Sequence, residues 1–231
     1  TFTSNLTNLT ENTTYYLRAY ATNEKGTSYG EEKSFETVDT PTINGYEYVD
    51  LGLPSGLKWA TCNVGASSPE DYGDYYAWGE TETKTEYTQD NSLTYGLSIS
   101  ELQSQGYIDG SGNLAPSHDA ARANWGSSWR MPTKEEQQEL IDNCTWTWTT
   151  QNGKNGYKVT GPNGNHIFLP AAGSRDGTSF YFGGGSYWSS TPHDYEYDGA
   201  YILYFSYGFE DVGWGGWGYR NCGRSVRPVS E

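Results

Sequence analysis

Residues 129–148 read WRMPTKEEQQELIDNCTWTW and contain the clearest helix signal of the chain. Thr133 stands at an N-cap position and Glu136 follows three residues later, which is the spacing of a capping box. Leu140 and Ile141 then give the segment a narrow apolar stripe. The stretch predicts a short helix that begins after Thr133 and is followed by a strand in the alternating TWTW.

The surrounding sequence predicts an α+β domain over residues 47–231. A second helix is expected in SHDAARAN, with Ser117 as its N-cap and Gly126 near its end. Glycine and asparagine turns separate short segments with strand character, which are TWTWTT, NGYKVTG, NHIFLPAAG, SYWSST, AYILYF and SVRPV. Two helices, many short antiparallel strands and long irregular connections are typical of the α+β class.

Residues 1–38 have a different pattern, which predicts an all-β region. TFTSNLTNL, TTYYLRAYATN and EEKSFET each alternate between two faces, and EKGTSYG is expected to be a turn. Three strands in antiparallel hairpins are therefore predicted. Pro41 and the Asn44–Gly45 pair indicate a linker over residues 39–46.

Charge and hydropathy restrict the partners of the 231-residue chain. Its net charge is −15, from 14 Lys and Arg against 29 Asp and Glu. Phosphate binding needs clustered basic residues, so neither nucleic acid nor an anionic membrane surface is an expected partner. No apolar run approaches the length of a membrane-spanning helix, and the first residues lack the pattern of a signal peptide. We expect a mature piece or fragment of a longer protein, with no membrane insertion by this segment.

The sequence predicts no metal site and no cofactor. Its three cysteines form no CxxC pair and no Cys/His cluster with zinc spacing. Glu70, Asp71 and Asp74 cluster in PEDYGDYYAWGE, but they lack a recognised calcium spacing and are interpreted as a solvated acidic loop. YFGGGSYW is rich in glycine, but it lacks lysine and is interpreted as a flexible turn rather than a phosphate loop.

Five motifs spread over residues 47–231 carry a family resemblance. They are LPSGLKWATCNVGASSPEDYGDYYAWGET, WRMPTKEEQQELIDNCTWTW, IFLPAAGSRDG, YWSSTP and SVRPV. Together they resemble the Fibrobacter succinogenes major paralogous domain family, which is related to the C-type lectin-like fold. The resemblance implies that fold, ligand binding on its loop face, and an extracellular location on a bacterial cell surface or phage virion.

The N-terminal region has a resemblance of its own. LTENTTYYLRAYATNEKGTSYG is similar to the last three strands of a fibronectin type III domain, an Ig-like sandwich. This piece is under half of such a domain, and the missing half would leave a sandwich core open. The resemblance therefore implies that the domain continues upstream of Thr1.

The resemblance also bears on the cysteines and on catalysis. If a disulfide forms, Cys62 with Cys144 is the expected pair, because both lie in scaffold motifs while Cys222 lies in the presumed variable loop. Formylglycine-generating enzymes share the broad fold and use a C-terminal cysteine pair, whereas only Cys222 lies in the matching region. None of the three histidines, His118, His166 and His193, belongs to a nucleophile motif. No catalytic residue is therefore expected, since a fold alone does not transfer chemistry.

The expected ligand-binding face lies between YWSSTP and SVRPV. Residues 193–198 and 207–224 are loops rich in rings, acids and glycine, a composition typical of antibody paratopes. In the intervening strand AYILYF, Ile202, Tyr204 and Ser206 share one face. The predicted ligand-binding residues are His193, Asp194, Tyr195, Glu196, Tyr197, Asp198, Ile202, Tyr204, Ser206, Tyr207, Phe209, Glu210, Asp211, Trp214, Trp217, Tyr219, Arg220, Asn221 and Arg224.

The same stretch is compatible with diversification by a retroelement. Randomised adenines in AAC or AAT codons yield no Lys, Gln, Met, Glu or Trp, and residues 193–224 contain no Lys, Gln or Met. Glu196, Glu210, Trp214 and Trp217 would then be fixed by the template. A duplicated adhesin family under ordinary selection would look similar, so both origins stay open.

Together these features predict a non-enzymatic adhesin or receptor-binding domain of a bacterial surface or phage protein. Its partner would be a protein or glycan on a cell surface, since aromatic faces stack on sugars and Tyr, Trp and Arg dominate protein hot spots. Two alternatives remain. In a structural spacer the rings would pack on one another, and in a formylglycine-generating-like enzyme Cys222 would be reactive.

Overall fold

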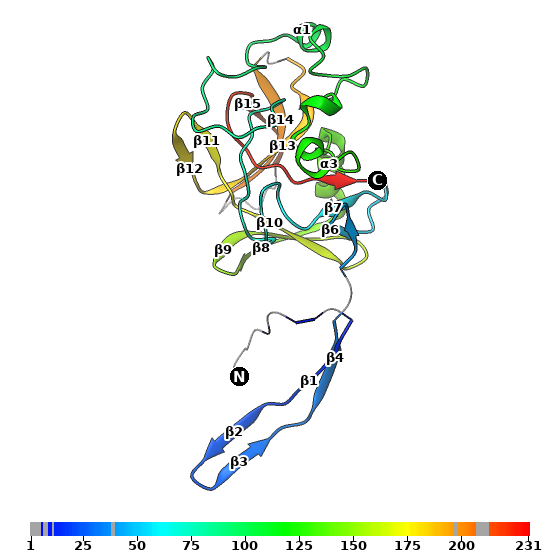
Figure 1. Cartoon of the computed structure of the whole chain (residues 1–231), viewed down its shortest axis with the longest axis vertical. Coiled ribbons are helices and arrows are strands. Elements are labelled where there is room, and N and C mark those ends of the chain that lie inside the picture. The colour runs from blue at the N-terminus through cyan, green and yellow to red at the C-terminus, as the bar shows by residue number, and fades with distance from the viewer. Residues whose placement is uncertain (1–5, 7–8, 11, 38–39, 196–197, 207–212) are drawn as a thin grey trace. The chain divides into compact units, whose positions relative to one another are not determined.

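The computed structural model describes residues 6, 9–10, 12–37, 40–195, 198–206 and 213–231, and only the backbone of residues 213–215. Its contacts divide the chain into two units, Thr1–Pro41 and Thr42–Glu231. In the described residues the first unit is all-β, and the second combines mostly antiparallel strands with three short α-helices (Figure 1). The predicted α+β class is confirmed at this level.

The N-terminal unit is one interrupted β-hairpin (Figure 1). Its strands are β1 (Thr14–Leu17), β2 (Tyr20–Asn23), β3 (Gly26–Tyr29) and β4 (Lys33–Glu36). β2 pairs with β3, and β1 pairs with β4. Between the two pairs the ladder is interrupted, and a hydrogen bond from Gly30 N to Ala19 O, 2.8 Å long, bridges the interruption. Gly26–Tyr29, expected as part of a turn, is a strand because the chain already reverses at Glu24 and Lys25. The strand expected in TFTSNLTNL falls mostly outside the described residues.

The hairpin of the N-terminal unit buries few of its own side chains. Tyr15 and Phe35 stack with ring centroids 5.8 Å apart. Tyr16, Tyr20 and Tyr29 are all more than half exposed. A two-stranded hairpin of this kind is at best marginally stable in water without further strands.

The second unit begins earlier than the predicted linker allows. Its first sheet has the order β16-β7-β6-β5, with strands β5 (Thr42–Ile43), β6 (Tyr46–Asp50), β7 (Lys58–Ala60) and β16 (Val229–Ser230). Asn44 and Gly45 have φ values of 51° and 81°, which suits the tight turn between β5 and β6. Residues 42–46 are therefore the opening hairpin of the second unit, and not part of a linker.

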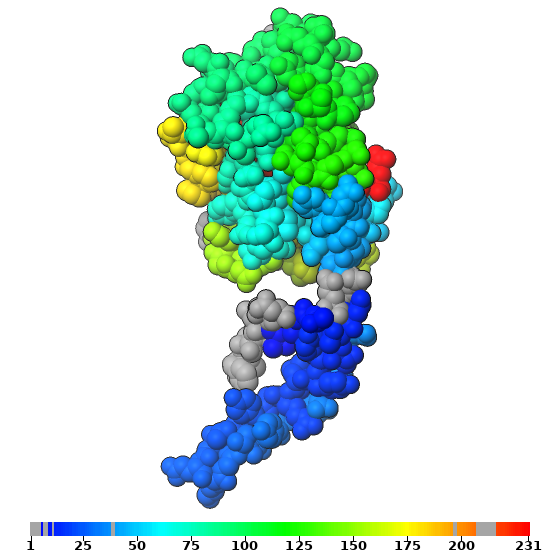
Figure 2. All heavy atoms as spheres, in the orientation of Figure 1, coloured from blue at the N-terminus to red at the C-terminus, as the bar shows by residue number. Residues whose placement is uncertain are grey.

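Three α-helices and one 3₁₀ turn lie between β7 and β8. They are α1 (Ile99–Ser104), η1 (Pro116–His118), α2 (Ala120–Trp125) and α3 (Lys134–Asn143). Figure 2 shows the connection after β7 together with α1 and α2, in cyan and green, covering one side of the second unit. The predicted helix after Thr133 is confirmed, and its capping box with Glu136 is complete in both directions.

Two details of the helices differ from the expectation. The N-cap of α2 is Asp119, whose Oδ1 accepts bonds from Ala121 N and Arg122 N, while Ser117 lies in the preceding 3₁₀ turn. Helix α1 was not predicted, although Ser98 and Glu101 form a capping box there as well.

The remaining strands form three antiparallel groups. β8 (Thr145–Gln151), β9 (Lys154–Thr160) and β10 (His166–Pro170) make one sheet, and β11 (Ser174–Asp176) pairs with β12 (Ser179–Tyr181). β13 (Gly184–Pro192), β14 (Gly199–Ser206) and β15 (Gly213–Tyr219) make the sheet that carries the C-terminal aromatic stretch. We call this last group the C-terminal sheet.

The C-terminal sheet separates two hydrophobic cores. Trp188 and Ile202 face each other across β13 and β14, and they pack into the core that contains Trp78 and Trp129. The opposite face of the sheet carries Tyr187, Leu203 and Phe205, which pack with Leu140 of α3 and with residues of β8–β10. The sheet is therefore held from both sides, as an element that positions a site must be.

Buried hydrogen bonds join the sequence motifs to one another. Trp78 Nε1 donates to Ser189 O at 2.9 Å, and Trp188 Nε1 donates to Tyr76 O at 2.8 Å. Each tryptophan thus donates a hydrogen bond to a backbone carbonyl in the motif that contains the other tryptophan. These residues are almost fully buried, so each bond removes a penalty that an unpaired polar group would impose.

The arginine of the SVRPV motif has a comparable role. Arg227 is buried, and its Nε donates to Asn63 Oδ1 at 2.8 Å while Nη2 donates to Phe168 O at 3.0 Å. Burial lowers the pKa of this guanidinium, and the carbonyl and amide acceptors around it compensate for lost water.

All three cysteines, Cys62, Cys144 and Cys222, are free thiols. The expected Cys62–Cys144 pair is not formed, because Cys62 packs beside the core that contains Trp188 and Cys144 beside the core on the opposite face of the C-terminal sheet.

Candidate ligand-binding face

One face of the C-terminal sheet, the face of Trp188 and Ile202, is covered by the core at one end and open at the other. Ser186 and Tyr204 are register partners two residues beyond Trp188 and Ile202, so they lie on the same face of the sheet. Whereas Trp188 and Ile202 are core residues, Tyr204 is 46% exposed. The face thus passes from packed core to open surface within two residues of each strand.

A cleft of about 460 Å³ opens on this uncovered end. Four aromatic residues are among those that line it, Tyr181, Phe182, Tyr204 and Trp217, with exposed fractions of 56%, 70%, 46% and 37%. They come from the end of β12 and from β14 and β15, which are separate in sequence. We call this hollow the aromatic cleft.

Arg224 and Ser186 are buried polar residues that line the aromatic cleft. Arg224 follows β15, and its backbone is fixed by a reciprocal pair of bonds with Tyr76, both 3.0 Å long. Arg224 Nε donates to Ser186 Oγ at 2.8 Å, and Nη1 donates to Tyr219 O at 3.1 Å. Although it lines the cleft, Arg224 is only 9% exposed, and burial lowers the pKa of its guanidinium.

A row of rings continues from the cleft along the edge of the sheet. The centroid distances are 6.3 Å for Tyr95–Tyr219, 5.1 Å for Tyr219–Trp217, 5.9 Å for Trp217–His193 and 4.7 Å for His193–Tyr201. We call these five residues the aromatic ribbon. Trp217 also lines the cleft, but it pairs with Tyr201 across the strands, so its ring lies on the face of the sheet opposite Tyr204, and the ribbon and the cleft meet at β15.

One end of the aromatic ribbon is anchored to helix α3. Tyr201 Oη donates to Asp194 Oδ2 at 2.8 Å, Lys134 Nζ lies 3.3 Å from the same carboxylate, and the ammonium also lies 4.6 Å from the Tyr201 ring centroid. The bond from Tyr201, followed by the effect of Lys134, lowers the pKa of Asp194. This arrangement fixes Tyr201 and Asp194, whereas Tyr195 beside them is 84% exposed.

The structure brings about half of the predicted ligand-binding residues to the surface. The exposed or half-exposed ones are His193, Asp194, Tyr195, Asp198, Tyr204, Ser206, Trp217 and Tyr219. Outside the described residues lie Glu196, Tyr197, Tyr207, Phe209, Glu210 and Asp211, and only the backbone of Trp214 is described. The remaining four, Ile202, Arg220, Asn221 and Arg224, are buried.

Burial gives two of these four, Arg220 and Asn221, a structural setting in place of the expected ligand contact. Ile202 packs into the core and also lines the aromatic cleft, so its role in binding stays a prediction. Arg220 is fully buried, where its Nε donates to Gly199 O at 2.8 Å and its Nη1 to Thr94 O at 2.7 Å. Arg220 therefore links the segment that precedes α1 to the start of β14. Asn221 beside it is also buried. Of the four, only Arg224 is a buried polar residue that lines the cleft.

Sequence reasoning missed three contributors to this surface. Tyr181, Phe182 and Ser186 lie in or beside YFGGGSYW, which was interpreted only as a flexible turn. The available signal was the pair of aromatic residues before three glycines. Gly184 and Gly185 pack so closely on Phe205 that side chains there would overlap it, which is why this region is rich in glycine.

The described residues offer little for catalysis or metal binding. Among them no group of three or more His, Cys, Asp or Glu side chains is placed to hold a metal ion. Cys222 is buried, and burial raises the pKa of its thiol, which disfavours the nucleophilic thiolate. The Nδ1 of His118 lies 3.2 Å from Gly79 O, and burial lowers the pKa of His166.

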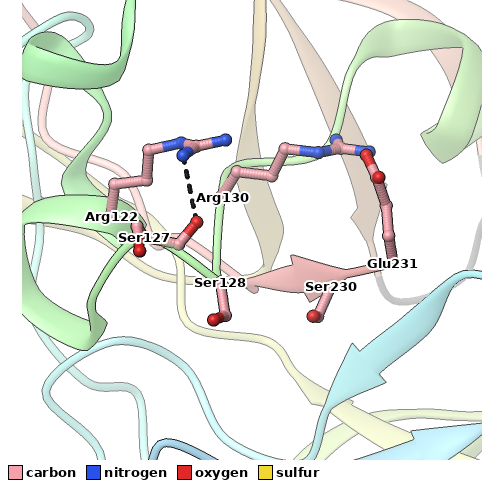
Figure 3. A pocket seen from close by; sticks show the side chains of 6 residues that line it. All are labelled: Arg122, Ser127, Ser128, Arg130, Ser230 and Glu231. Atoms are coloured by element: carbon pink, nitrogen blue, oxygen red, sulfur yellow. Dashed lines mark hydrogen bonds and ion pairs between the residues drawn. The ribbon is translucent and has the colours of Figure 1, made fainter.

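A second cleft, of about 270 Å³, lies between α2 and the C-terminal strand (Figure 3). Arg122 and Arg130 line it, but both are engaged. Arg122 Nη1 donates to Ser127 O at 3.0 Å, and Arg130 Nη2 lies 2.6 Å from Glu136 Oε1 and 3.5 Å from Glu231 Oε1. Its cationic groups are thus already matched by acceptors of the chain itself.

The aromatic cleft and ribbon are accordingly the strongest candidate site. No family model, no curated protein and no solved structure matches the chain. In the described part of the chain, no helix has both the length and the apolar character needed to span a membrane.

Proposed function

We propose that this protein is a non-enzymatic ligand-binding module, an adhesin or receptor-binding domain of a bacterial surface or phage protein. The observation that carries the proposal is the pair of exposed aromatic surfaces, the aromatic ribbon and the aromatic cleft, which meet at β15. Tyr and Trp present large rigid contact areas and lose little rotamer entropy on binding. Their support by a sheet packed on both faces pre-organises them for a partner.

We also propose a C-type lectin-like fold for the second unit and a fibronectin type III-like origin for the hairpin. The first is supported by the way buried bonds from Trp78, Trp188 and Arg227 join the motifs of the family resemblance. The second is supported by the open faces of the hairpin, whose exposed tyrosines suit a sheet that further strands would cover. With these assignments we propose an extracellular location, on a bacterial surface or virion.

The exposure of the rings favours a binding surface over a structural spacer. A spacer would be expected to bury its aromatic residues against one another. Instead Tyr204, Tyr219 and Trp217 keep between a third and a half of their surface open, and Tyr195 keeps most of it. An enzyme of the formylglycine-generating type is disfavoured by the buried, high-pKa thiol of Cys222.

The experiment is a binding screen with a pair of matched double variants. The labelled full chain is applied to an array of purified glycans and bacterial surface proteins. Trp217→Ala with Tyr219→Ala should reduce every specific signal by at least about tenfold, the loss expected for hot-spot rings. Tyr16→Ala with Tyr29→Ala, on the N-terminal hairpin, should leave the signals unchanged. Binding that survives the first pair, or an array without any specific signal, would refute the proposal.

The retroelement hypothesis is a separate proposal about origin. It is supported by the location of the candidate codons, since residues 193–195, 198–206 and 217–224 supply much of the ribbon and part of the cleft lining. Sequencing of the flanking DNA tests it. A reverse transcriptase gene and a near-duplicate of the last hundred or so bases should lie nearby, and their absence would favour ordinary selection.

A further inference from the structure

Three buried arginines, Arg220, Arg224 and Arg227, have no carboxylate partner among the described residues, and of these only Arg224 lines the aromatic cleft. No carboxylate of the described residues lies within 4.0 Å of Arg224, in contrast to Arg130, which pairs with Glu136 at 2.6 Å. Asp176 acts on it only at longer range. A buried guanidinium usually has an anionic partner, since desolvation of a lone charge is costly.

The guanidinium of Arg224 also has unused hydrogen-bond donors. A guanidinium carries five N–H groups. Ser186 Oγ and Tyr219 O accept two of them, and the Cys222 thiol is a third, weak acceptor. At least two donors therefore remain at a residue that lines an open cleft. Arg227, by comparison, makes four hydrogen bonds with carbonyl and amide oxygens of the chain.

The unused donors fit a single planar anion. The fork of an arginine matches a carboxylate, which accepts two parallel N–H bonds. The whole chain carries a charge of −15, which opposes the approach of multiply charged or polymeric phosphates. A carboxylate, with one charge, suits this cleft better than a phosphate does.

The walls of the cleft define what carries the carboxylate. Tyr181, Phe182 and Tyr204 line the cleft with exposed side chains, and the flat apolar faces of such rings suit the C–H faces of a pyranose. A volume of about 460 Å³ accommodates a whole ring, within the range of small-molecule sites. An acidic peptide side chain on a flexible stem would leave most of this space and these rings unused.

We propose that the aromatic cleft binds the carboxylate-bearing ring of an acidic glycan, with Arg224 holding the carboxylate and the rings of Tyr181, Phe182 and Tyr204 contacting the sugar. This inference rests on the proposed ligand-binding function and specifies the ligand of the same surface. The ribbon beside the cleft would contact the neutral sugars that follow the acidic ring.

The test uses ligands that differ only in the carboxylate. Sialyllactose, its methyl ester and lactose, and a digalacturonate with its methyl ester, are titrated against the full chain by ligand-observed NMR. At least one of the two free acids should bind, and its ester should bind at least about tenfold more weakly, because the ester cannot accept the paired bonds of Arg224. Raising the salt concentration should weaken the acid more than the ester.

Two protein variants complete the test without removing Arg224. Tyr204→Ala should weaken binding of the acid at least about fivefold, as expected for loss of one stacking ring. The matched Tyr16→Ala, on the N-terminal hairpin, should have no effect. Equal binding of acid and ester, or binding of neither acid at 10 mM-scale concentration, would overturn the inference.

The outcomes separate this inference from the proposed function. If the array finds a protein or a neutral glycan whose binding depends on Trp217 and Tyr219, the function stands and the acidic ligand is wrong. If an acid binds with the same affinity in Tyr204→Ala and wild-type protein, the carboxylate is held elsewhere, and the assignment to this cleft fails.

Discussion

The guanidinium carbon of Arg224 lies 4.4 Å from the centroid of the Trp188 ring. The ring is fully buried and its Nε1 is bonded to Tyr76 O, so it cannot move away from the cation above it. A cation over a desolvated aromatic face contributes about 2 kcal/mol. The floor of the candidate site is thus built directly on the hydrophobic core, and core packing and ligand geometry are coupled through this pair.

Trp188→Ala and Trp217→Ala should separate core from surface. Trp188 is fully buried, so its loss should lower the free energy of unfolding by about 3 kcal/mol or more. Trp217 is 37% exposed on an edge strand, so its loss should cost about 1 kcal/mol or less. Urea unfolding followed by far-ultraviolet circular dichroism measures both. Equal losses would show that the ribbon is a packed core element and not a binding surface.

The helices show what local sequence can and cannot specify. Helix α3 was predictable because Thr133 and Glu136 form a capping box within four residues. The start of α2 was not, because Ser117 and Asp119 are both good N-caps. Tertiary structure decides between them, since Asp119 Oδ2 also accepts a bond from Met131 N at 2.8 Å.

Asp119→Ala should therefore destabilise the protein more than loss of an ordinary cap. Asp119 is buried and accepts bonds from three backbone N–H groups, those of Ala121, Arg122 and Met131. Without the carboxylate these N–H groups lose their acceptor, which should lower the free energy of unfolding by about 2 kcal/mol or more, since each buried unsatisfied donor carries its own penalty. Urea unfolding measures the loss. Ser117→Ala is the control and should change stability by less than about 0.5 kcal/mol. A larger loss of stability in Ser117→Ala than in Asp119→Ala would instead identify Ser117 as the N-cap.

Thr133→Ala tests the capping box of α3 by itself. Its hydroxyl accepts a bond from Glu136 N at 3.3 Å, and its removal should cost about 1 kcal/mol. Thr133→Ser keeps the hydroxyl and should recover most of that loss. Denaturant melts give both values, and ligand binding in the folded fraction should be unchanged. A neutral Thr133→Ala would mean that tertiary packing alone holds the helix.

The candidate site was predictable in composition but not in the role of each residue. Tyr204, Trp217 and Tyr219 emerge at the surface, as the pattern of rings and glycines suggested. Arg220 and Arg224 come from the same loop and look alike in sequence, yet one is locked by carbonyls and the other lines the cleft. That difference arises from distant partners, such as Thr94 for Arg220 and Ser186 for Arg224.

The thiols should respond to pH in a defined direction. Burial raises the pKa of Cys144 to about 11 from the ordinary value of 9.0. Below pH 9 the thiol is protonated in both native and unfolded states, so stability is unaffected. Between pH 9 and 11 only the unfolded thiol ionises, and stability should fall with rising pH. The slope of the stability profile in this window should be smaller in Cys144→Ser, and an unchanged slope would contradict the assignment.

Thiol labelling checks the free cysteines directly. Without reductant, unfolded protein should titrate three thiols, because Cys62, Cys144 and Cys222 are all unpaired. Native protein at neutral pH should react slowly, since burial raises the pKa of each thiol. A count of one thiol in the unfolded chain would reveal a disulfide.

Gly218→Ala should act through Arg224. A Cβ at Gly218 would overlap the guanidinium of Arg224, whereas the backbone of Gly218 can accept alanine because its φ is not positive. The guanidinium must therefore move from its place between Trp188 and Ser186, and overpacking of this kind costs about 1–3 kcal/mol. Gly110→Ala, with open space around it, is the matched control and should be nearly neutral.

A double-mutant cycle then isolates the contact. In an Arg224→Ala background the guanidinium is absent, so Gly218→Ala should lose most of its effect on stability, with a coupling energy of about 1 kcal/mol or more. Urea unfolding of the four proteins gives this value without any ligand. In wild-type background, the displaced guanidinium should also weaken binding of the carboxylated probe by about tenfold. Additive losses in the cycle would show that Gly218 and Arg224 do not touch, and that the floor of the cleft is built differently.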